Sequence, residues 1–421
     1  MLVSRALGAY MRHVNRRGMK FGPESEEART LEPTPGRRYL LYVHIPFCEV
    51  LCPFCSFQRV EYKQEKSAPY FLALREEIRH YHARGFEFSE VYVGGGTPTV
   101  NPGELAETLG LIKSLFSVTR ISTETNPNHL DAERFGVLTD CGVNRLSVGV
   151  QSFDDELLES MGRYYSYGSC EQILEHLQAA AGIFDTLNVD MIFNLPRQTA
   201  ESLARDLDIL KTRVSVDQVS FYPLMAAEST RRRMAREMGV VTHDREERFY
   251  RMIQASMTDP YRPASAWCFS RGDGMIDEYI VDHEEYIGVG SGAFSFLNGH
   301  LYATTFSIPR YTDLVPRYGT AVTRGRVLSR LEQHRYHFMM TLFGLSMSKA
   351  AARERFGPGY FRTLWREFLV FRLLGAFHED GDLIRLTDRG MYYWVVMMRE
   401  FLTGVNRLRD DMRTHIRQEI E

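Results

Sequence analysis

Short β-rich runs alternate with helical segments from residue 39 to residue 225, and this alternation limits the possible folds more than any other feature. Strands are expected in YLLYVHI, EVYVGG, RISTETNP, NRLSVGVQS, TLNVDMIFNL and QVSFYPLM. Helices are expected over residues 68–84, 102–116, 131–142, 169–184 and 201–213. About six β/α units of this kind predict an α/β fold with parallel strands and crossover helices. In a full or partial (β/α) barrel, the active site lies at the carboxyl ends of the strands.

The sequence divides into four regions. We expect an N-terminal extension and linker over residues 1–37, the core barrel over 38–230, and a less regular region that completes it over 231–327. Residues 328–421 predict a separate helical domain of winged-helix-like shape, with a wing hairpin in DLIRLTDRG. Acidic residues crowd this wing: Glu379, Asp380, Asp382 and Asp388. Because phosphate contacts require basic side chains, we expect no nucleic-acid partner and a lid or substrate-shaping role.

The first 20 residues contain apolar side chains at near-helical spacing together with several arginines. Such a helix either lies on a membrane surface or a partner, or packs on the core of its own chain. The net charge of −3 does not favour nucleic acid, and no apolar run approaches the ~20 residues that cross a bilayer. The N-terminus also lacks the apolar core of a secretory signal. We expect a cytoplasmic protein, with any membrane contact peripheral at the inner face.

The cysteines are too few for a disulfide framework: six in 421 residues. Cys141, Cys170 and Cys268 stand alone and are expected to be small buried or half-buried residues. The other three fall within the run HIPFCEVLCPFCSF: Cys48, Cys52 and Cys55.

This cysteine run predicts a metal centre. Fe–S clusters are ordinarily held by four cysteines, so three leave one iron open to a small molecule. A zinc site would need a fourth Cys or His close by, and the nearby His44 precedes the loop. We therefore predict a 4Fe–4S cluster with one open coordination site.

Two further signals follow expected strands. VYVGGGTPT places three glycines after a strand, where the backbone can closely approach a polar ligand. STETNP places Glu124 at the end of another strand, suited to accept hydrogen bonds from ribose hydroxyls.

These motifs in combination resemble the radical S-adenosylmethionine (SAM) superfamily, and within it the oxygen-independent coproporphyrinogen III oxidase-like branch. The resemblance rests on Cys-x3-Cys-x2-Cys after YVHIPF, GGGTPT, Glu124 and NRLSVGVQSF, and runs from about residue 39 to 296. It implies a partial (β/α)6 barrel and a cluster whose open iron binds SAM. Electron transfer then cleaves SAM to methionine and a 5′-deoxyadenosyl radical. A reductant such as flavodoxin or ferredoxin is implied.

The resemblance also implies two SAM molecules. Tyr42, Gly95 and Glu124 match contacts to the first. The positions that match contacts to the second are Phe54, Gly96, Thr97, Gln151, Arg163 and Asp190. The glycine-rich run from Gly288 to Ser295 matches a SAM-adjacent loop and adds Phe294 as a cofactor-binding candidate.

The sequence also departs from parts of this branch. Coproporphyrinogen oxidases carry a further cysteine just after the third ligand, where this chain has Ser56 and Phe57. Heme chaperones carry an HNxxYW-like motif, whereas this chain has DEYIVDHEEY. Both functions lose support, and the class C methyltransferases of the branch become the first hypothesis.

Class C methyltransferases use both SAM molecules to methylate an sp² carbon. The run YYWVVMMREFLTGVNRLRDDMR resembles their menaquinone C8-methyltransferases, which implies an aromatic or lipid-quinone substrate. A tetrapyrrole-modifying oxidase and a heme carrier stay open as alternatives. The chemistry needs a nearby base, and the candidates are Tyr279, Asp282, His283, Glu284 and Glu285.

Overall fold

The computed structural model describes residues 2–26, 29–272 and 283–420, and a mixed sheet runs through its centre. Six parallel strands form the middle of this sheet in sequence order: β1 (Arg38–Ile45), β4 (Glu87–Gly95), β5 (Arg120–Thr125), β6 (Arg145–Gln151), β7 (Thr186–Phe193) and β8 (Gln218–Pro223). These are the six predicted strands, with ends shifted by one to three residues. The α/β expectation is confirmed.

Additional strands extend the sheet on both sides. β11 (Tyr286–Val289) lies parallel to β1 on its other side, with Leu40 opposite Tyr286. Antiparallel strands follow beyond it: β12 (Phe294–Leu297), β13 (His300–Thr304) and β14 (Val322–Val327). Beyond β8 lie two short antiparallel strands: β10 (Cys268–Ser270) and β9 (Arg262–Pro263). Strands from the less regular region therefore extend the sheet on both sides.

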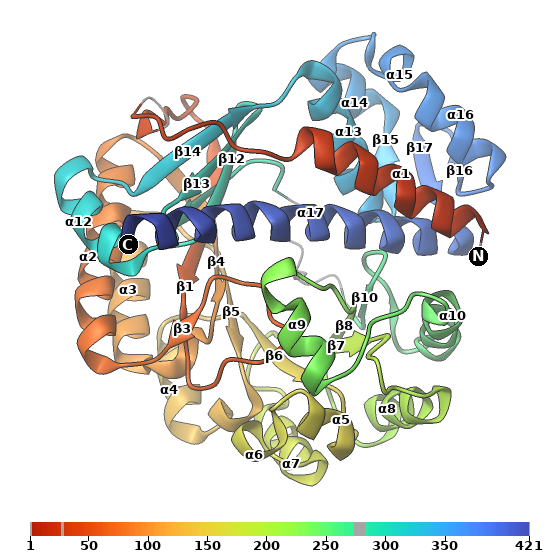
Figure 1. The fold of residues 1–421 in the computed structure, drawn as a ribbon, viewed down its shortest axis with the longest axis horizontal. Helices are drawn as coiled ribbons and strands as arrows, with labels where there is room; N and C mark the ends of the chain where they lie inside the picture. Colours follow the sequence, from red (N-terminus) through yellow and green to blue (C-terminus); the bar gives the residue numbers. More distant parts are fainter. Residues whose placement is uncertain (1, 27–28, 273–282, 421) are drawn as a thin grey trace.

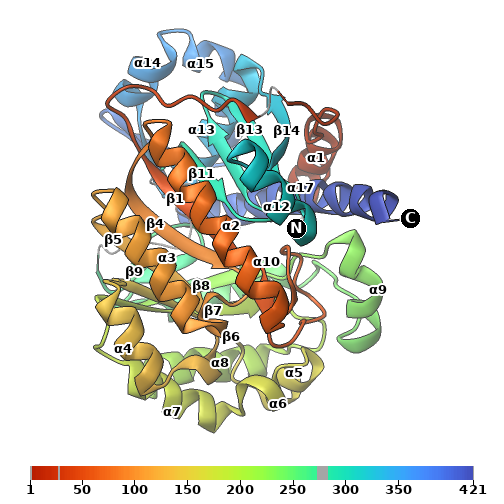
Figure 2. The same ribbon diagram turned by 90° about the vertical axis from the view of Figure 1, so that its left-hand side faces the viewer.

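Helices cover the outer face of the curved sheet (Figure 2). The predicted crossover helices are α2 (Gln64–Ala83), α3 (Pro102–Leu115), α4 (Ala132–Asp140), α7 (Cys170–Ala180) and α8 (Ala200–Thr212). Every β1 residue from Tyr39 to Ile45 is buried, because helices lie on one face and the interior of the molecule on the other. Five helices were not predicted: α5 (Asp155–Ser160), α6 (Tyr164–Tyr167), α9 (Glu228–Glu237), α10 (Glu246–Ser256) and α12 (Ile308–Tyr318).

The C-terminal region has the expected helical, winged-helix-like form. Its elements are α13 (Arg330–Phe343), β15 (Ser346–Ser348), α14 (Lys349–Phe356), α15 (Tyr360–Thr363), α16 (Trp365–Leu373), β16 (Phe377–Asp380) and β17 (Leu383–Leu386). β16 and β17 form the wing hairpin, and β15 pairs with β17. The chain breaks at Leu364 between α15 and α16.

The last helix, α17 (Asp388–Ile420), is 33 residues long and runs across the molecule (Figure 1). The first helix, α1 (Leu2–Gly18), packs along it. Arg12 forms an ion pair with Glu400 at 2.6 Å, and the Asn15 side chain donates to the Glu400 carbonyl oxygen at 2.8 Å. Of the two interpretations of the N-terminal helix, packing on its own chain is the one observed. No helix in the described part of the chain is both long and apolar enough to span a membrane.

Candidate active site

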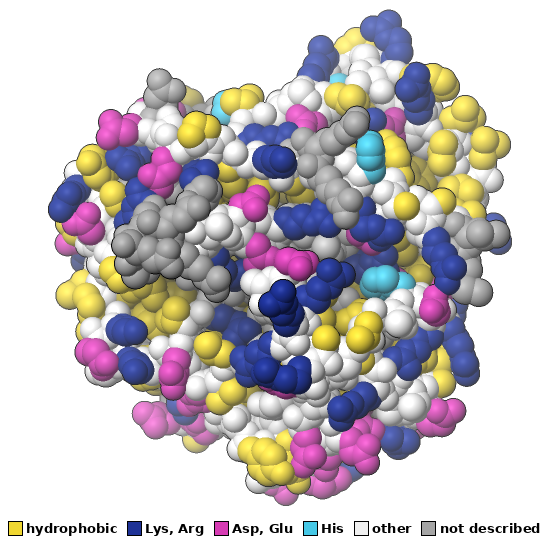
Figure 3. Space-filling model, in the orientation of Figure 1, with side chains coloured by type: hydrophobic (Ala, Val, Ile, Leu, Met, Phe, Trp, Pro, Cys, Tyr) yellow, Lys and Arg dark blue, Asp and Glu magenta, His cyan; other side chains and the backbone are white. Residues whose placement is uncertain are grey.

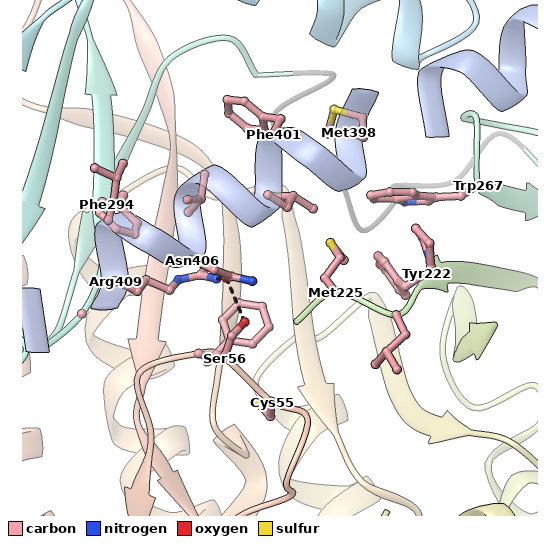
Figure 4. Close-up of a pocket in the computed structure, with 18 of the residues that line it drawn as sticks. Cys55, Ser56, Tyr222, Met225, Trp267, Phe294, Met398, Phe401, Asn406 and Arg409 are labelled. Carbon is pink, nitrogen blue, oxygen red and sulfur yellow. Dashed lines mark hydrogen bonds between the residues drawn. The ribbon is translucent and has the colours of Figure 1, made fainter. Parts of the chain in front are cut away.

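The carboxyl ends of the parallel strands open into a cavity of about 590 Å³. α17 forms its roof, and Figure 4 shows Cys55 and Ser56 on one side of the cavity below this helix. α1 closes another side with Leu7, Met11 and Val14. The apolar face of α1 therefore lines the cavity.

The cysteine loop follows β1 directly. Cys48 ends the short strand β2 (Phe47–Cys48), which pairs with β3 (Val60–Glu61) and so closes the loop on itself. The Arg59 guanidinium donates to the carbonyl oxygens of Cys52 at 2.5 Å and Cys55 at 2.7 Å. These contacts hold the loop in place, and all three thiols face the cavity.

The pKa of the Cys48 thiol is raised to about 12, mainly by burial and then by the neighbouring Cys55, whereas Thr97 and Arg59 lower it. A cationic partner also reaches Cys52, since Arg163 Nη1 lies 3.5 Å from its sulfur. No three His, Cys, Asp or Glu side chains within the described ranges converge as around a single ion. A 4Fe–4S cluster takes each thiolate on a different iron, so its ligands surround a larger space.

The glycine turn after β4 leaves room beside the cysteine loop. A Cβ on Gly94 would lie 2.7 Å from the Glu124 carboxylate, and one on Gly96 would lie 2.6 Å from the Phe47 carbonyl oxygen. Glu124 accepts hydrogen bonds from Tyr92 and from the Gly95 backbone, each at 3.1 Å. Only glycine permits this close approach of backbone to ligand space.

The three residues predicted around the first SAM all line the cavity: Tyr42, Gly95 and Glu124. Tyr42 shares a hydrogen bond with His44 Nδ1 at 3.0 Å. Burial lowers the pKa of His44 to about 4, and its Nε2 contacts the Gln58 carbonyl oxygen at 2.8 Å. Two neutral polar rings therefore stand beside the cysteine loop.

The residues predicted around the second SAM also line the cavity: Phe54, Gly96, Thr97, Gln151, Arg163 and Asp190. Phe294, the candidate from the SAM-adjacent loop, lines it as well. Arg163 is buried, donates to Asn126 Oδ1 at 2.9 Å and to the Gly149 carbonyl oxygen, and lies over the Tyr167 ring. Asn126 in turn donates to Thr97 at 2.8 Å. The structure thus connects residues from three strand ends, although their roles toward SAM stay predictions.

Two residues that line the cavity from neighbouring strands, Gln151 and Asp190, are held in defined conformations. Gln151 has a φ of 76°, a left-handed conformation that is uncommon outside glycine and tends to occur at functional sites. Asp190 accepts hydrogen bonds from Ser147 at 3.0 Å and Asn188 at 2.8 Å, which orient its carboxylate.

The superfamily profile described as "Radical SAM superfamily" matches residues 42–210. This range begins in the strand that leads into the cysteine loop and includes the glycine turn, Glu124 and Arg163. This part of the chain is therefore similar to the radical SAM superfamily. The similarity implies a 4Fe–4S cluster and SAM as cofactors.

Similar proteins match this chain over most of their length. The heme chaperone HemW of Bacillus subtilis (strain 168) is 26% identical over 373 residues, which are 83% of this chain and 95% of the relative. The oxygen-independent coproporphyrinogen III oxidase of Salmonella typhimurium is 27% identical over 405 residues, covering 89% and 86%. The structure of coproporphyrinogen III oxidase (HemN) from Escherichia coli superposes with a TM-score of 0.72 at 24% identity, covering 89% and 92%. This superposition confirms the radical SAM fold.

The predicted base candidates do not meet in the radical SAM cavity. His283, Glu284 and Glu285 precede β11, at the amino ends of the strands, and pair with Glu90, Arg355 and Arg37 respectively. None of these three lines the cavity. They were misplaced because β11 runs parallel to β1, which puts the residues before it at the opposite edge. Tyr279 and Asp282 lie outside the described residues.

The contacts between α17 and the cysteine loop were not predicted from the sequence. Asn406 accepts a hydrogen bond from Ser56 at 2.8 Å, and Arg409 lies over the Phe57 ring at 4.5 Å (Figure 4). Arg413 donates to the backbone oxygens of Ser56 and Phe57, each at 2.8 Å. No local motif marks these residues, because they reach the cysteine loop only through the fold.

Replacing Gly95 with alanine should impair SAM cleavage by about tenfold or more. Gly95 has a φ of +117°, and an added Cβ would lie 2.7 Å from the His44 ring, so both the turn and His44 must shift. Small misplacements of this kind can cost up to ~100-fold in rate. The measurement is 5′-deoxyadenosine formation by the reconstituted protein.

Gly110→Ala is the matched control for this prediction. Gly110 lies within α3, and a Cβ there meets nothing within 4 Å. Cleavage should be unchanged, and removing a helical glycine should stabilise the chain by about 0.5–1 kcal/mol. Equal cleavage by the Gly95→Ala and Gly110→Ala variants would contradict the role of the turn.

Proposed function

We propose that the chain is a radical SAM methyltransferase that modifies an sp² carbon of an apolar aromatic substrate. The observation that carries this proposal is the composition of the cavity wall facing the cysteine loop. Tyr222, Met225 and Trp267 lie along one side (Figure 4). Further apolar side chains come from the helices: Phe338, Met339, Phe371, Met397, Met398, Phe401 and Leu402.

The charges on this wall support a substrate with few ionic groups. Arg326 is paired with Glu332, and Arg335 is paired with Glu367 at 2.7 Å. A porphyrinogen bearing several carboxylates would be expected to meet arginines held ready for it. The charges of both arginines are instead balanced by carboxylates of the chain, so this part of the cavity offers an almost neutral surface. A quinone-type ring with an apolar tail suits such a surface.

The residues of the chain would hold the cofactors by ordinary contacts. Cys48, Cys52 and Cys55 would bind the cluster, which supplies the electron that cleaves SAM to methionine and a 5′-deoxyadenosyl radical. Glu124 would accept hydrogen bonds from ribose hydroxyls. A second SAM would lie against Arg163, whose buried guanidinium suits a carboxylate.

Ser56, which follows the third cysteine, supports a function different from that of the coproporphyrinogen oxidases. Where those enzymes are expected to carry a cysteine, Ser56 donates to Asn406 on α17. The serine thus ties the cysteine loop to the roof of the cavity.

The second candidate is an oxidase-like radical enzyme acting on a tetrapyrrole. The relatives named above support it better than they support a methyltransferase, because they are a coproporphyrinogen oxidase and a heme chaperone. The two candidates predict different products from SAM, and this difference separates them.

The deciding experiment measures both SAM products under anaerobic conditions. We expect 5′-deoxyadenosine and S-adenosylhomocysteine to rise together, in about equal amounts, when demethylmenaquinone or menaquinone is added to the reduced, reconstituted protein. Methyl transfer consumes one SAM as donor and one as radical source, which gives this ratio.

Coproporphyrinogen III is the matched alternative substrate. If it raises 5′-deoxyadenosine without S-adenosylhomocysteine while the quinones have no effect, the oxidase-like candidate replaces the methyltransferase. Deoxyadenosine alone with the quinone substrates would also contradict methyl transfer.

A further inference from the structure

One helix of the winged-helix-like region is apolar on both of its sides. The inner side of α16 is buried: Phe371 stacks near Trp394 with ring centroids 4.9 Å apart, and Phe368 contacts Phe338 at the same distance. Its outer side is also apolar and faces solvent: Trp365, Leu369, Val370 and Leu373, each between 47% and 78% exposed. We call these four residues the α16 face.

The α16 face forms one continuous strip. Trp365, Leu369 and Leu373 are spaced by four residues, which aligns them along one side of a helix, and Val370 lies beside them. Hydrophobic side chains gather over α16 at the right-hand edge of Figure 3. Single exposed apolar residues are ordinary, but a contiguous exposed strip marks an interaction site.

Arginines surround the strip. Arg353, Arg362 and Arg366 are exposed and form no ion pair within the described part of the chain. Arg366 lies over the Trp365 ring at 5.4 Å. A groove of about 480 Å³ opens beside Trp365, with Arg353 among its lining residues.

Some nearby acids are already paired: Glu379 is held by both Lys349 and Arg372, and Asp380 lies 3.8 Å from Arg385. Asp382 accepts hydrogen bonds from Ser348 and from the Ala350 backbone, and Glu354 beside Arg353 is exposed. The surface around the strip therefore presents unpaired cations together with exposed apolar side chains.

We propose that the α16 face docks the protein on an anionic lipid bilayer. Trp365, Leu369 and Leu373 would enter the interface, while Arg362 and Arg366 would meet lipid phosphates. An apolar helix face with tryptophan and flanking cations is the pattern of interfacial helices. Tryptophan is enriched at the headgroup level, and basic residues near an anionic surface strengthen binding to it.

The position of α16 connects this surface to the cavity. Glu367 and Phe371, on the inner side of the same helix, line the cavity described above. A single helix thus separates the docking surface from the apolar wall. The proposal adds a partner to the proposed function but does not depend on catalysis, because vesicle binding requires no turnover.

Vesicle binding by the full chain with its cluster tests the proposal. Sedimentation should show binding to vesicles of phosphatidylcholine mixed with phosphatidylglycerol, weaker binding to phosphatidylcholine alone, and loss of binding at high salt. The double variant Leu369→Ser/Leu373→Ser should reduce partitioning by at least about tenfold. Arg362→Gln/Arg366→Gln should reduce it by about tenfold on anionic vesicles and flatten the salt dependence.

Intrinsic fluorescence gives a second readout of docking. The chain has three tryptophans, and Trp267 and Trp394 are buried whereas Trp365 is 55% exposed. A blue shift of emission on adding anionic vesicles would therefore report Trp365. Trp365→Phe should abolish the shift and keep most of the binding.

Val240→Ser is the matched control, because Val240 is 74% exposed and lies outside the α16 face. Absence of vesicle binding, or equal binding by the Val240→Ser and Leu369→Ser/Leu373→Ser variants, would overturn the proposal. If the α16 variants instead lose self-association or reduction by an acidic flavodoxin while vesicle binding persists, the surface takes a protein rather than a bilayer.

Discussion

The Cys52→Ala variant should contain no intact 4Fe–4S cluster, and its formation of 5′-deoxyadenosine should fall to the background of the assay. Cys52 lies in the loop that Arg59 fastens, and its sulfur faces the same cavity as those of Cys48 and Cys55. With only two thiolates, the loop no longer offers the three ligands that leave one iron open. Iron and sulfide content and the electron paramagnetic resonance signal after reduction measure the cluster independently of turnover.

Cys170→Ala is the matched control for the cysteine loop. Cys170 begins α7 on the outer layer of helices and does not line the cavity. This variant should keep a full cluster and normal SAM cleavage. A Cys52→Ala protein that retained a 4Fe–4S signal altered by SAM would refute the ligand assignment.

Arg399→Met should destabilise the chain by about 3–5 kcal/mol, because it leaves the buried carboxylate of Glu246 without its guanidinium partner. Arg399 on α17 pairs with Glu246 on α10, which is fully buried, and with Glu400 at 2.8 Å. Glu400 also pairs with Arg12 on α1. Arg399 therefore links the roof of the cavity to α10, and Glu400 links it to α1. Urea denaturation followed by circular dichroism measures the change.

The pH dependence of stability gives a second test of this network. Burial alone would raise the pKa of Glu246, but the hydrogen bond from His243 and the charge of Arg399 outweigh burial and lower it. Because the folded-state pKa lies below the unfolded value of ~4.3, this stabilisation is present above that pH. It is lost as the pH falls through the folded-state pKa. In the Arg399→Met variant, the free energy of unfolding should therefore decrease less as the pH falls through this range.

An exposed ion pair provides the control for Arg399. Arg213 contacts both carboxylate oxygens of Glu171 on the surface, at 2.9 and 2.7 Å. Solvent screens such pairs, so Arg213→Met should change the free energy of unfolding little. If the Arg399→Met and Arg213→Met variants lost equal free energy of unfolding, the buried ion pairs of α17 would not contribute specially to stability.

Local sequence signals predicted the core of this fold because each strand and helix is short and has its own pattern. The runs around β1, β4 and β6 are apolar, are buried on both faces, and end where a motif begins. The cysteine loop, the glycine turn and Glu124 were therefore placed together by the rule that parallel strands end at one edge.

Features that depend on distant contacts escaped the sequence analysis. Nothing near Asn406 or Arg413 in the chain indicates that they reach Ser56, more than 300 residues away. The same limit explains the base candidates: His283 looked close to the SAM-adjacent loop in sequence, but β11 carries it to the opposite edge. The short β9 and β10 strands had no periodicity long enough to detect.

The roof of the cavity also constrains when the site can close during synthesis. α17 follows every strand of the sheet in the chain, and domains fold as the chain emerges from its amino end. Until residues 388–420 leave the ribosome, the cysteine loop has no Asn406 or Arg413 above it, and the apolar wall is open. The cavity is therefore most open before α17 has emerged, and α17 completes it as the last element of the chain.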